Sequence, residues 1–389
     1  MTRGAAFRRV TAVCALVVFA IAPAHAESPN YHLQKRVDQT RSDYGLVGLG
    51  AVIATSKDGV VEIAVSGQRV LGGDDPIRVT DSWHIGSNTK MLTALLYARL
   101  VQAGHAKWGA TLPEMFPQLA EDMDAGWTDV TIEDLLSHRS GAAANASMGW
   151  MLAAKADKSP LDEQRARLVA RTVAAPPSGT RGEFVYSNLG FMMAGAAIER
   201  IASDVPALRG NPYETLLREL VILKGPEGSA AGFGFGPPRT GPQGHGPRLF
   251  GLGLRAFGRG VDADNPAALG PAGTVHYSLR GHATMLLSFL DGPDALPKAM
   301  RAKLMSPYPD GTSEYALGWG MKQVWPAGEA FMHAGSNTLW LSQVVVLPSV
   351  DTVIIVNTNQ YNQNADKAVR ELTEALVAQA GTQRRLNDE

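Results

Sequence analysis

Cysteine is almost missing from this sequence: its 389 residues contain one, Cys14, which lies in an apolar N-terminal stretch. A chain of this length can bury a core large enough to fold without disulfides. Common metal-binding patterns are missing too, because there is no His-Glu-x-x-His and no cluster of cysteine and histidine. We therefore expect no metal and no cofactor.

A strong excess of charge of either sign is also lacking. The 36 lysines and arginines nearly balance the 37 acidic residues, and the formal net charge is −1. There is no long basic run and no interleaving of basic and aromatic residues, so we expect no nucleic-acid partner. A Gly-x-Ser-x-Gly elbow is missing, which argues against an α/β-hydrolase.

Long apolar runs are confined to the N-terminus. Three arginines and the apolar stretch Val10–Ala22 precede a small-x-small site that ends at Ala26, which is typical of a secretory signal. The stretch is shorter than the roughly 20 residues that span a membrane. We interpret residues 1–26 as a signal peptide and expect export across the inner membrane to the periplasm, with no stable membrane anchor. Retention through an uncleaved signal stays an alternative.

Apolar, β-branched stretches occur near both ends of the mature chain. Residues 49–55 and 60–65 flank a turn, and residues 341–347 and 352–357 flank another, so each pair predicts a β-hairpin. The middle of the chain shows the aliphatic spacing of helices. This pattern predicts an α+β fold: an antiparallel sheet flanked by helices and closed by both chain ends, with an all-helical region inserted.

We expect one domain over residues 27–380. Its sheet region covers about 27–95 plus 270–380, its helical and loop insertion about 96–270, and a polar tail follows at 381–389. The glycine- and proline-rich segment 224–273 is either a loop system over a functional site or a flexible surface excursion.

Ser87 and Lys90 stand at a predicted junction between an extended stretch and a helix. They are three residues apart, so a helix places both side chains on one face. A neighbouring base can activate a serine hydroxyl, and a partly desolvated lysine can be that base. The alternative is an ordinary serine and lysine at a helix start, and the four-residue pattern alone does not decide between them.

Two later motifs supply further candidates. Tyr186-Ser187-Asn188 lies in a loop before a predicted helix; a buried tyrosine near a lysine can hold a lowered pKa and exchange protons, and Asn188 can bind the lysine or a substrate carbonyl. His333-Ala334-Gly335 precedes a predicted strand, where glycine lets a substrate lie close to the backbone. Taken alone, each motif also fits a structural tyrosine or histidine.

In order along the chain, the three motifs resemble those of the serine β-lactamase and penicillin-binding protein superfamily, over nearly the whole mature chain. The nearest branch holds class C β-lactamases, DD-peptidases and related esterases. Flanking stretches match as well: His84-Ile85-Gly86, residues 135–141, Pro271-Ala272-Gly273, Gly318-Trp319-Gly320 and Asn357. The β-lactamase/transpeptidase-like fold that this implies agrees with the predicted sheet and helical insertion.

The resemblance also implies catalytic roles. Ser87 would be the acylated nucleophile, Lys90 its proton partner and Tyr186 the general base and acid. The backbone N–H groups of Ser87 and Ser336 would form the oxyanion hole.

Three more residues would bind substrate, again by resemblance. Asn188 would position it, His333 would support a substrate carboxylate or Tyr186, and Gly335 would let the substrate approach the strand. Where class C β-lactamases have Lys-Thr-Gly, this chain has His-Ala-Gly. Ala334 lacks the hydroxyl that often helps to hold a carboxylate.

The function implied is that of an exported serine hydrolase that acts through an acyl-serine on an amide or ester of a small molecule or peptide. DD-peptidase-like and esterase-like activities rank equally, and β-lactam hydrolysis ranks lower. The alternative is a catalytically silent scaffold that recognises penicillin and binds cell-wall peptide or a protein partner. Oligomeric state stays open.

Overall fold

A six-stranded antiparallel sheet forms the centre of the computed structural model, which describes residues 32–248 and 253–388. Its strands lie in the order β2-β1-β11-β10-β9-β8. In that order they span Gly59–Gly67, Gly48–Thr55, Thr352–Thr358, Leu341–Leu347, Gly328–Ser336 and Gly320–Val324. Strand β1 pairs with β11, so the two ends of the chain close the sheet, and both predicted hairpins are present. The predicted signal peptide lies outside the described residues.

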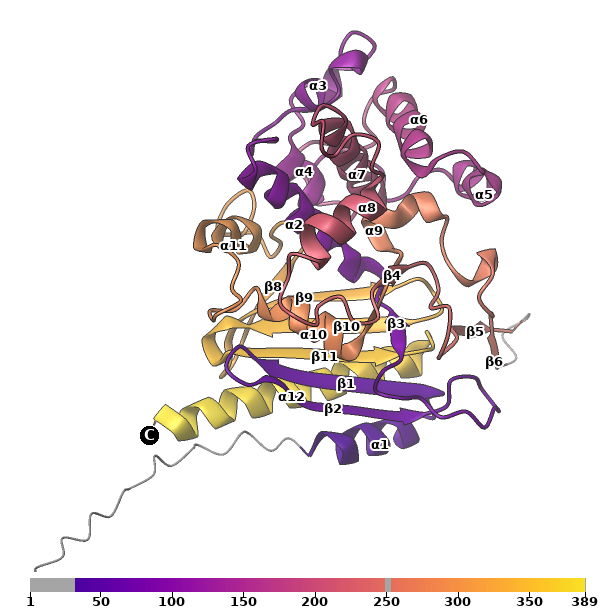
Figure 1. Ribbon diagram of the computed structural model, residues 1–389, viewed down its shortest axis with the longest axis vertical. Helices are drawn as coiled ribbons and strands as arrows, with labels where there is room; N and C mark the ends of the chain where they lie inside the picture. The colour runs from indigo at the N-terminus through magenta and orange to yellow at the C-terminus, as the bar shows by residue number, and fades with distance from the viewer. Residues whose placement is uncertain (1–31, 249–252, 389) are drawn as a thin grey trace, which may run out of the picture.

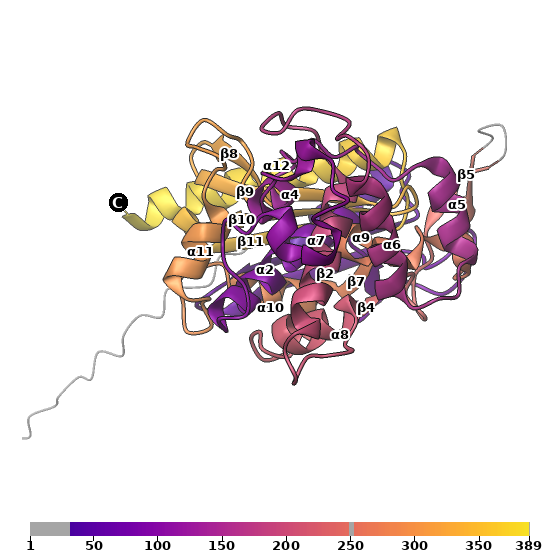
Figure 2. The same cartoon turned by 90° about the horizontal axis from the view of Figure 1, so that it is seen from above.

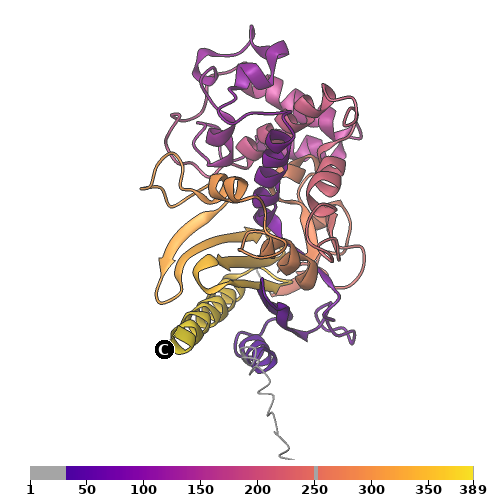
Figure 3. The same cartoon turned by 60° about the vertical axis from the view of Figure 1, so that its left-hand side comes forward.

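Side chains alternate between the two faces of this sheet, and each face packs against its own layer of helices (Figures 1 and 3). Leu49 and Ile53 of β1 join the core beneath the sheet, with α1 (Leu33–Asp43) and α12 (Gln363–Asp388). Val52, between them in sequence, joins the larger core on the opposite face. In α12 the apolar side chains that face the sheet are buried: Ala365, Ala368, Val369, Leu372 and Leu376.

The larger core lies between the sheet and the helical region, which Figure 2 shows from above. Helix α10 (Leu279–Leu287) packs on β1, β2 and β11, and α2 (Thr89–Gln102) and α7 (Asn188–Ser203) lie near the middle of the helical region. Most of α2 is buried, as expected of a helix that is apolar all round. Apart from short 3₁₀ and π-helical turns, the remaining helices of the described residues are α3 (Leu112–Met115), α4 (Ile132–Leu136), α5 (Met148–Ala156), α6 (Leu161–Val173), α8 (Tyr213–Leu217), α9 (Gly270–Gly273) and α11 (Lys298–Met305).

Two small sheets are not predicted by the sequence patterns. One contains β3 (Ser82–His84), β7 (Val275–Ser278) and β4 (Gly234–Phe235), and the other β5 (His245–Pro247) and β6 (Leu254–Ala256). Strands of two to four residues are too short for an alternating pattern to be visible. At the C-terminus, α12 continues through Asp388, into the segment predicted as a polar tail.

Candidate active site

Ser87 lies where the short strand β3 turns into the central helix. Residues Gly86–Asn88 form a 3₁₀ turn and α2 follows from Thr89, so the α-helix begins slightly later than its predicted start at Ser87. Gly86 has a φ of 53°, and a Cβ atom there would lie 2.4 Å from Ser336 N. Both facts restrict the position to glycine. The Thr89 hydroxyl donates to the Gly86 carbonyl at 2.7 Å and closes the turn.

Lys90 is fully buried, and three oxygen atoms surround its amine. Its Nζ lies 2.7 Å from Asn188 Oδ1, 2.7 Å from the Ala272 carbonyl oxygen and 3.1 Å from Ser87 Oγ. Burial lowers the pKa of Lys90 well below its usual value. A neutral amine would give its two N–H groups to the carbonyl oxygens, which leaves its lone pair for the proton of Ser87. This geometry favours Lys90 as the base.

Asn188 begins α7, and its amide is held from both ends. Its Nδ2 donates to Asn145 Oδ1 at 2.8 Å, which turns its Oδ1 toward Lys90. The preceding residue, Ser187, caps the helix by accepting from the Gly190 N–H. Asn188 is therefore placed by the helix start as well as by its own hydrogen bonds.

Tyr186 lies in the loop before α7, with its ring centroid 4.8 Å from Lys90 Nζ and its hydroxyl hydrogen-bonded to Ser87. Burial raises the pKa of Tyr186 to about 12. The sequence motif suggests instead that a buried tyrosine near a lysine can hold a lowered pKa, but burial outweighs that effect in the fold. With a raised pKa, Tyr186 keeps its proton near neutral pH and acts as a donor.

His333 belongs to a chain of buried hydrogen bonds whose direction can be worked out. His138 Nδ1 accepts from the Ser187 N–H at 2.9 Å, so in the neutral ring the proton sits on Nε2, 3.1 Å from the Tyr315 hydroxyl. Tyr315 then donates to His333 Nε2 at 3.1 Å, and His333 Nδ1 donates to the Ala334 carbonyl at 3.0 Å. Both ring nitrogens of His333 are engaged, and burial lowers its pKa to about 3.

The backbone of β9 passes in contact with the turn Gly86–Asn88, which contains Ser87. A Cβ on Gly335 would lie 1.9 Å from the Ile85 carbonyl oxygen and 2.8 Å from Ser87 N. The register of β8 with β9 runs only as far as Met332, so the half of β9 next to Ser87 lies at the sheet edge. Ser87 N lies next to Gly335, and Ser336 N lies next to Gly86, so both backbone nitrogens are at this contact.

The structure thus brings together every residue that the sequence analysis proposes for the site. Three neighbours are not predicted as site residues: the Ala272 carbonyl, His138 and Tyr315. Only their position in the sequence could have identified them: Ala272 and His138 lie within the flanking stretches that match the family, and Tyr315 shortly precedes Gly318. Ala272 also shows that the end of segment 224–273 packs against the site.

Comparison with known proteins identifies the family. The Beta-lactamase family model matches residues 33–379. Over 118 residues, or 30% of each chain, the sequence is 31% identical to "Penicillin-binding protein 4" of Amycolatopsis lactamdurans. Over 308 residues it is 25% identical to "Unguisins hydrolase ungD'" of Aspergillus campestris, which covers 72% of this chain and 53% of that protein. The chain spans about half or less of the length of these relatives.

A solved structure agrees with the fold. That of a D-stereospecific amidohydrolase from Streptomyces sp. matches with a TM-score of 0.66 and 20% identity, over 88% of this chain and 98% of that one. At this identity the likeness shows the fold alone. It confirms the predicted antiparallel sheet flanked by helices with an all-helical region.

Proposed function

Because the chain belongs to the beta-lactamase family, we propose that it is a serine hydrolase that forms an acyl intermediate on Ser87 and acts on an ester or an amide. The observation that carries this proposal is the buried amine of Lys90, 3.1 Å from Ser87 Oγ with its other two positions bound to carbonyl oxygens. Serine becomes a competent nucleophile when such a base takes its proton. The hydrolase and amidohydrolase among the similar proteins support this class of reaction.

In the acylation step, Lys90 takes the proton of Ser87 while Oγ attacks the substrate carbonyl carbon. The negative charge that develops on the carbonyl oxygen is stabilised by the N–H groups of Ser87 and Ser336. Loss of one such donor typically costs on the order of 10²–10³ in rate. Asn188 keeps the Lys90 amine in place.

Collapse of the tetrahedral intermediate breaks the bond to the leaving group, which must gain a proton. Tyr186, protonated near neutral pH and hydrogen-bonded to Ser87, is placed to give it, and the proton held by Lys90 then restores the phenol. Water later attacks the acyl-serine, with the proton transfers running in reverse. The proton that leaves Ser87 in acylation is replaced in deacylation by one from water, so the protons balance over one turnover without a cofactor.

His333 argues for a substrate without a carboxylate at the scissile bond. The resemblance assigns this position to carboxylate support, but both ring nitrogens are engaged and the ring is neutral near pH 7. A neutral ring without a free N–H gives a carboxylate neither charge nor hydrogen bond. We therefore favour uncharged esters and amides over β-lactams and peptides that end in D-alanine.

Export to the periplasm remains part of the proposal and depends on the N-terminal sequence pattern alone. Within residues 32–248 and 253–388, no helix combines the length and apolar character that crossing a membrane requires. Comparing the mass of the protein in a periplasmic fraction with that of the full chain tests the signal peptide: loss of residues 1–26 is the expected result.

The first experiment is intact mass spectrometry of the mature protein with a p-nitrophenyl ester and, separately, with a fluorescent penicillin. We expect rapid ester turnover and no lasting penicillin adduct. A stable penicillin adduct mapped to Ser87 would instead point to a DD-peptidase-like role. With neither adduct nor turnover, the silent scaffold becomes the better explanation.

The matched variant is Ser87→Ala, which removes one oxygen atom from a half-buried position. It should abolish turnover and leave the melting temperature within about 2 °C, because Lys90 keeps its bonds to Asn188 and to the Ala272 carbonyl. Activity in the purified variant would refute the acyl-serine mechanism.

A further inference from the structure

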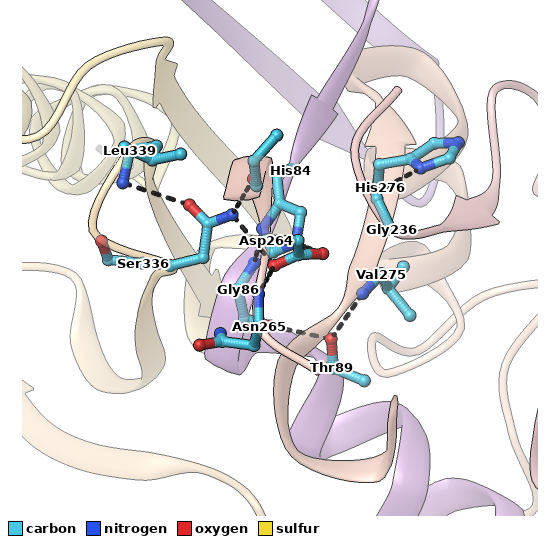
Figure 4. A network of polar contacts seen from close by, with 12 residues as sticks. His84, Gly86, Thr89, Gly236, Asp264, Asn265, Val275, His276, Ser336 and Leu339 are labelled. Atoms are coloured by element: carbon cyan, nitrogen blue, oxygen red, sulfur yellow. Dashed lines mark hydrogen bonds and ion pairs between the residues drawn. The ribbon is translucent and has the colours of Figure 1, made fainter. Parts of the chain in front are cut away.

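Asp264 belongs to none of the three motifs, yet its carboxylate is buried close to Gly86–Asn88, the nucleophile turn that contains Ser87 (Figure 4). One oxygen, Oδ2, lies 2.9 Å from His84 Nε2. The other, Oδ1, accepts from Asn337 Nδ2 at 3.0 Å and from the Asn265 N–H at 2.8 Å. A buried carboxylate is tolerated when its oxygens are hydrogen-bonded, and here each oxygen has its own partner on a different segment of the chain.

Each carboxylate oxygen of Asp264 starts one arm of a hydrogen-bond network, and the first arm, from Oδ2, leads to the nucleophile. His84 Nδ1 accepts from the Gly86 N–H at 3.1 Å, so His84 donates to Asp264 through Nε2. Gly86 immediately precedes Ser87. Through the His84 ring, one carboxylate oxygen of Asp264 therefore holds the backbone of the nucleophile turn.

The second arm leads to the end of β9. Asn337 immediately follows Ser336, and its amide donates to Asp264 and to the Ala263 carbonyl, at 3.0 and 3.2 Å. Its Oδ1 accepts from the Leu339 N–H at 3.2 Å. With both ends of the amide engaged, Asn337 cannot rotate without losing hydrogen bonds, so it fixes the backbone next to Ser336.

We propose that Asp264 is a positioning residue that ties together the two halves of the oxyanion hole, the Ser87 N–H and the Ser336 N–H. The two halves come from segments about 250 residues apart in sequence, and they touch where Gly86 meets Ser336 N. An oxyanion hole stabilises charge because its donors are already in place before the reaction. This inference rests on the proposed function, since it assigns a task within the same site.

Asp264→Asn tests the proposal with almost no change of shape. A carboxylate offers two acceptor oxygens, one for each arm, whereas a carboxamide offers one acceptor and one donor. The NH₂ group must then face either the His84 N–H or the donors on the Asn337 side. One arm is lost whichever way the amide turns.

The experiment measures kcat and KM with p-nitrophenyl acetate, and inhibition by phenylboronic acid, which forms a tetrahedral adduct on serine. We expect Asp264→Asn to lower kcat by about 10- to 100-fold while KM changes by less than about threefold. The inhibition constant of the boronic acid should rise by a similar factor, because its adduct resembles the transition state. Counting active sites from the p-nitrophenol burst normalises each rate to folded enzyme.

Asp81→Asn is the matched control. Asp81 is also a buried aspartate, and its oxygens bind Arg69 and the Arg78 N–H rather than the site. This variant should lose stability but keep its kcat per active site. If Asp264→Asn behaves in the same way, Asp264 has only a structural role and the inference is overturned.

A second variant covers the case in which Asp264→Asn does not fold. Asn337→Ala cuts only the arm to β9 and should lower kcat and weaken boronic acid binding, whereas an unchanged kcat would overturn the inference. The two hypotheses fail differently. Wild-type protein without turnover or boronic acid binding refutes the proposed function, while active wild type with equally active variants refutes the role of Asp264 alone.

Discussion

The two faces of the central sheet are built on the same strands but from different kinds of residue. On the face toward α1 and α12, Ile53, Ile354 and Val345 lie opposite one another and form an aliphatic row. On the face toward the helical region, one row across four strands contains no aliphatic side chain: Gly50, Asn357, Ser342 and Gly335.

The small and polar row is where the nucleophile turn rests on the sheet. A Cβ on Gly50 would lie 3.0 Å from Trp83 Cζ2, and Ser342 Oγ accepts from Asn88 Nδ2 at 2.8 Å. Gly335 makes the same kind of room on β9. The site face therefore buries less apolar surface where the Ser87 turn contacts it, whereas the opposite face is packed with aliphatic side chains.

Gly335→Ala tests the site face of the sheet and should have the largest effect. The added methyl group would collide with the Ile85 carbonyl and press on Ser87 N, so the turn must move away from β9. We expect kcat/KM for a p-nitrophenyl ester to fall by at least about 100-fold, as when an oxyanion donor is misplaced. Gly149→Ala is the control, since a Cβ there meets nothing within 4 Å. Equal activity of the two variants would mean that the contact at Gly335 is not needed.

Leu376→Ala tests the opposite face. Leu376 is fully buried between α12 and the sheet, and truncating a buried leucine costs about 2–5 kcal/mol. We expect the free energy of unfolding to drop by that amount, measured by chemical denaturation, while kcat per active site stays at the wild-type value. A large fall in kcat would show that packing on this face also controls the site, and the two faces could not be treated separately.

The sequence was informative wherever a pattern is local. Apolar runs with turn residues predict the two hairpins, and Ser87 with Lys90 is recognisable because three residues of helix bring both onto one face. The partners of Asp264 lie at positions 84 and 337, and only the tertiary fold brings them together. The raised pKa of Tyr186 was not predicted, for the same reason: how strongly burial acts on the hydroxyl depends on what the rest of the chain packs around it.

The smallest predicted effect is a dependence of stability on pH, and it arises on the face of the sheet toward the helical region. His282 of α10 is fully buried on the site face, stacks on Tyr277 and has no hydrogen-bond partner on either nitrogen among the described residues. Burial lowers its pKa from 6.5 to about 3. Between these values the unfolded chain binds a proton that the folded protein excludes, so stability falls as the pH drops from about 6.5 toward 3.

Replacing His282 by phenylalanine keeps the ring stacked on Tyr277 and removes the titrating group. The free energy of unfolding, measured by denaturation from pH 7 to pH 4, should then fall less steeply, by about 1.4 kcal/mol per pH unit below pH 6. At pH 7 the variant should already be more stable by about 1 kcal/mol, because no unpaired ring nitrogen is buried. If His282→Phe has the wild-type slope, then the loss of stability at low pH does not come from this histidine of α10.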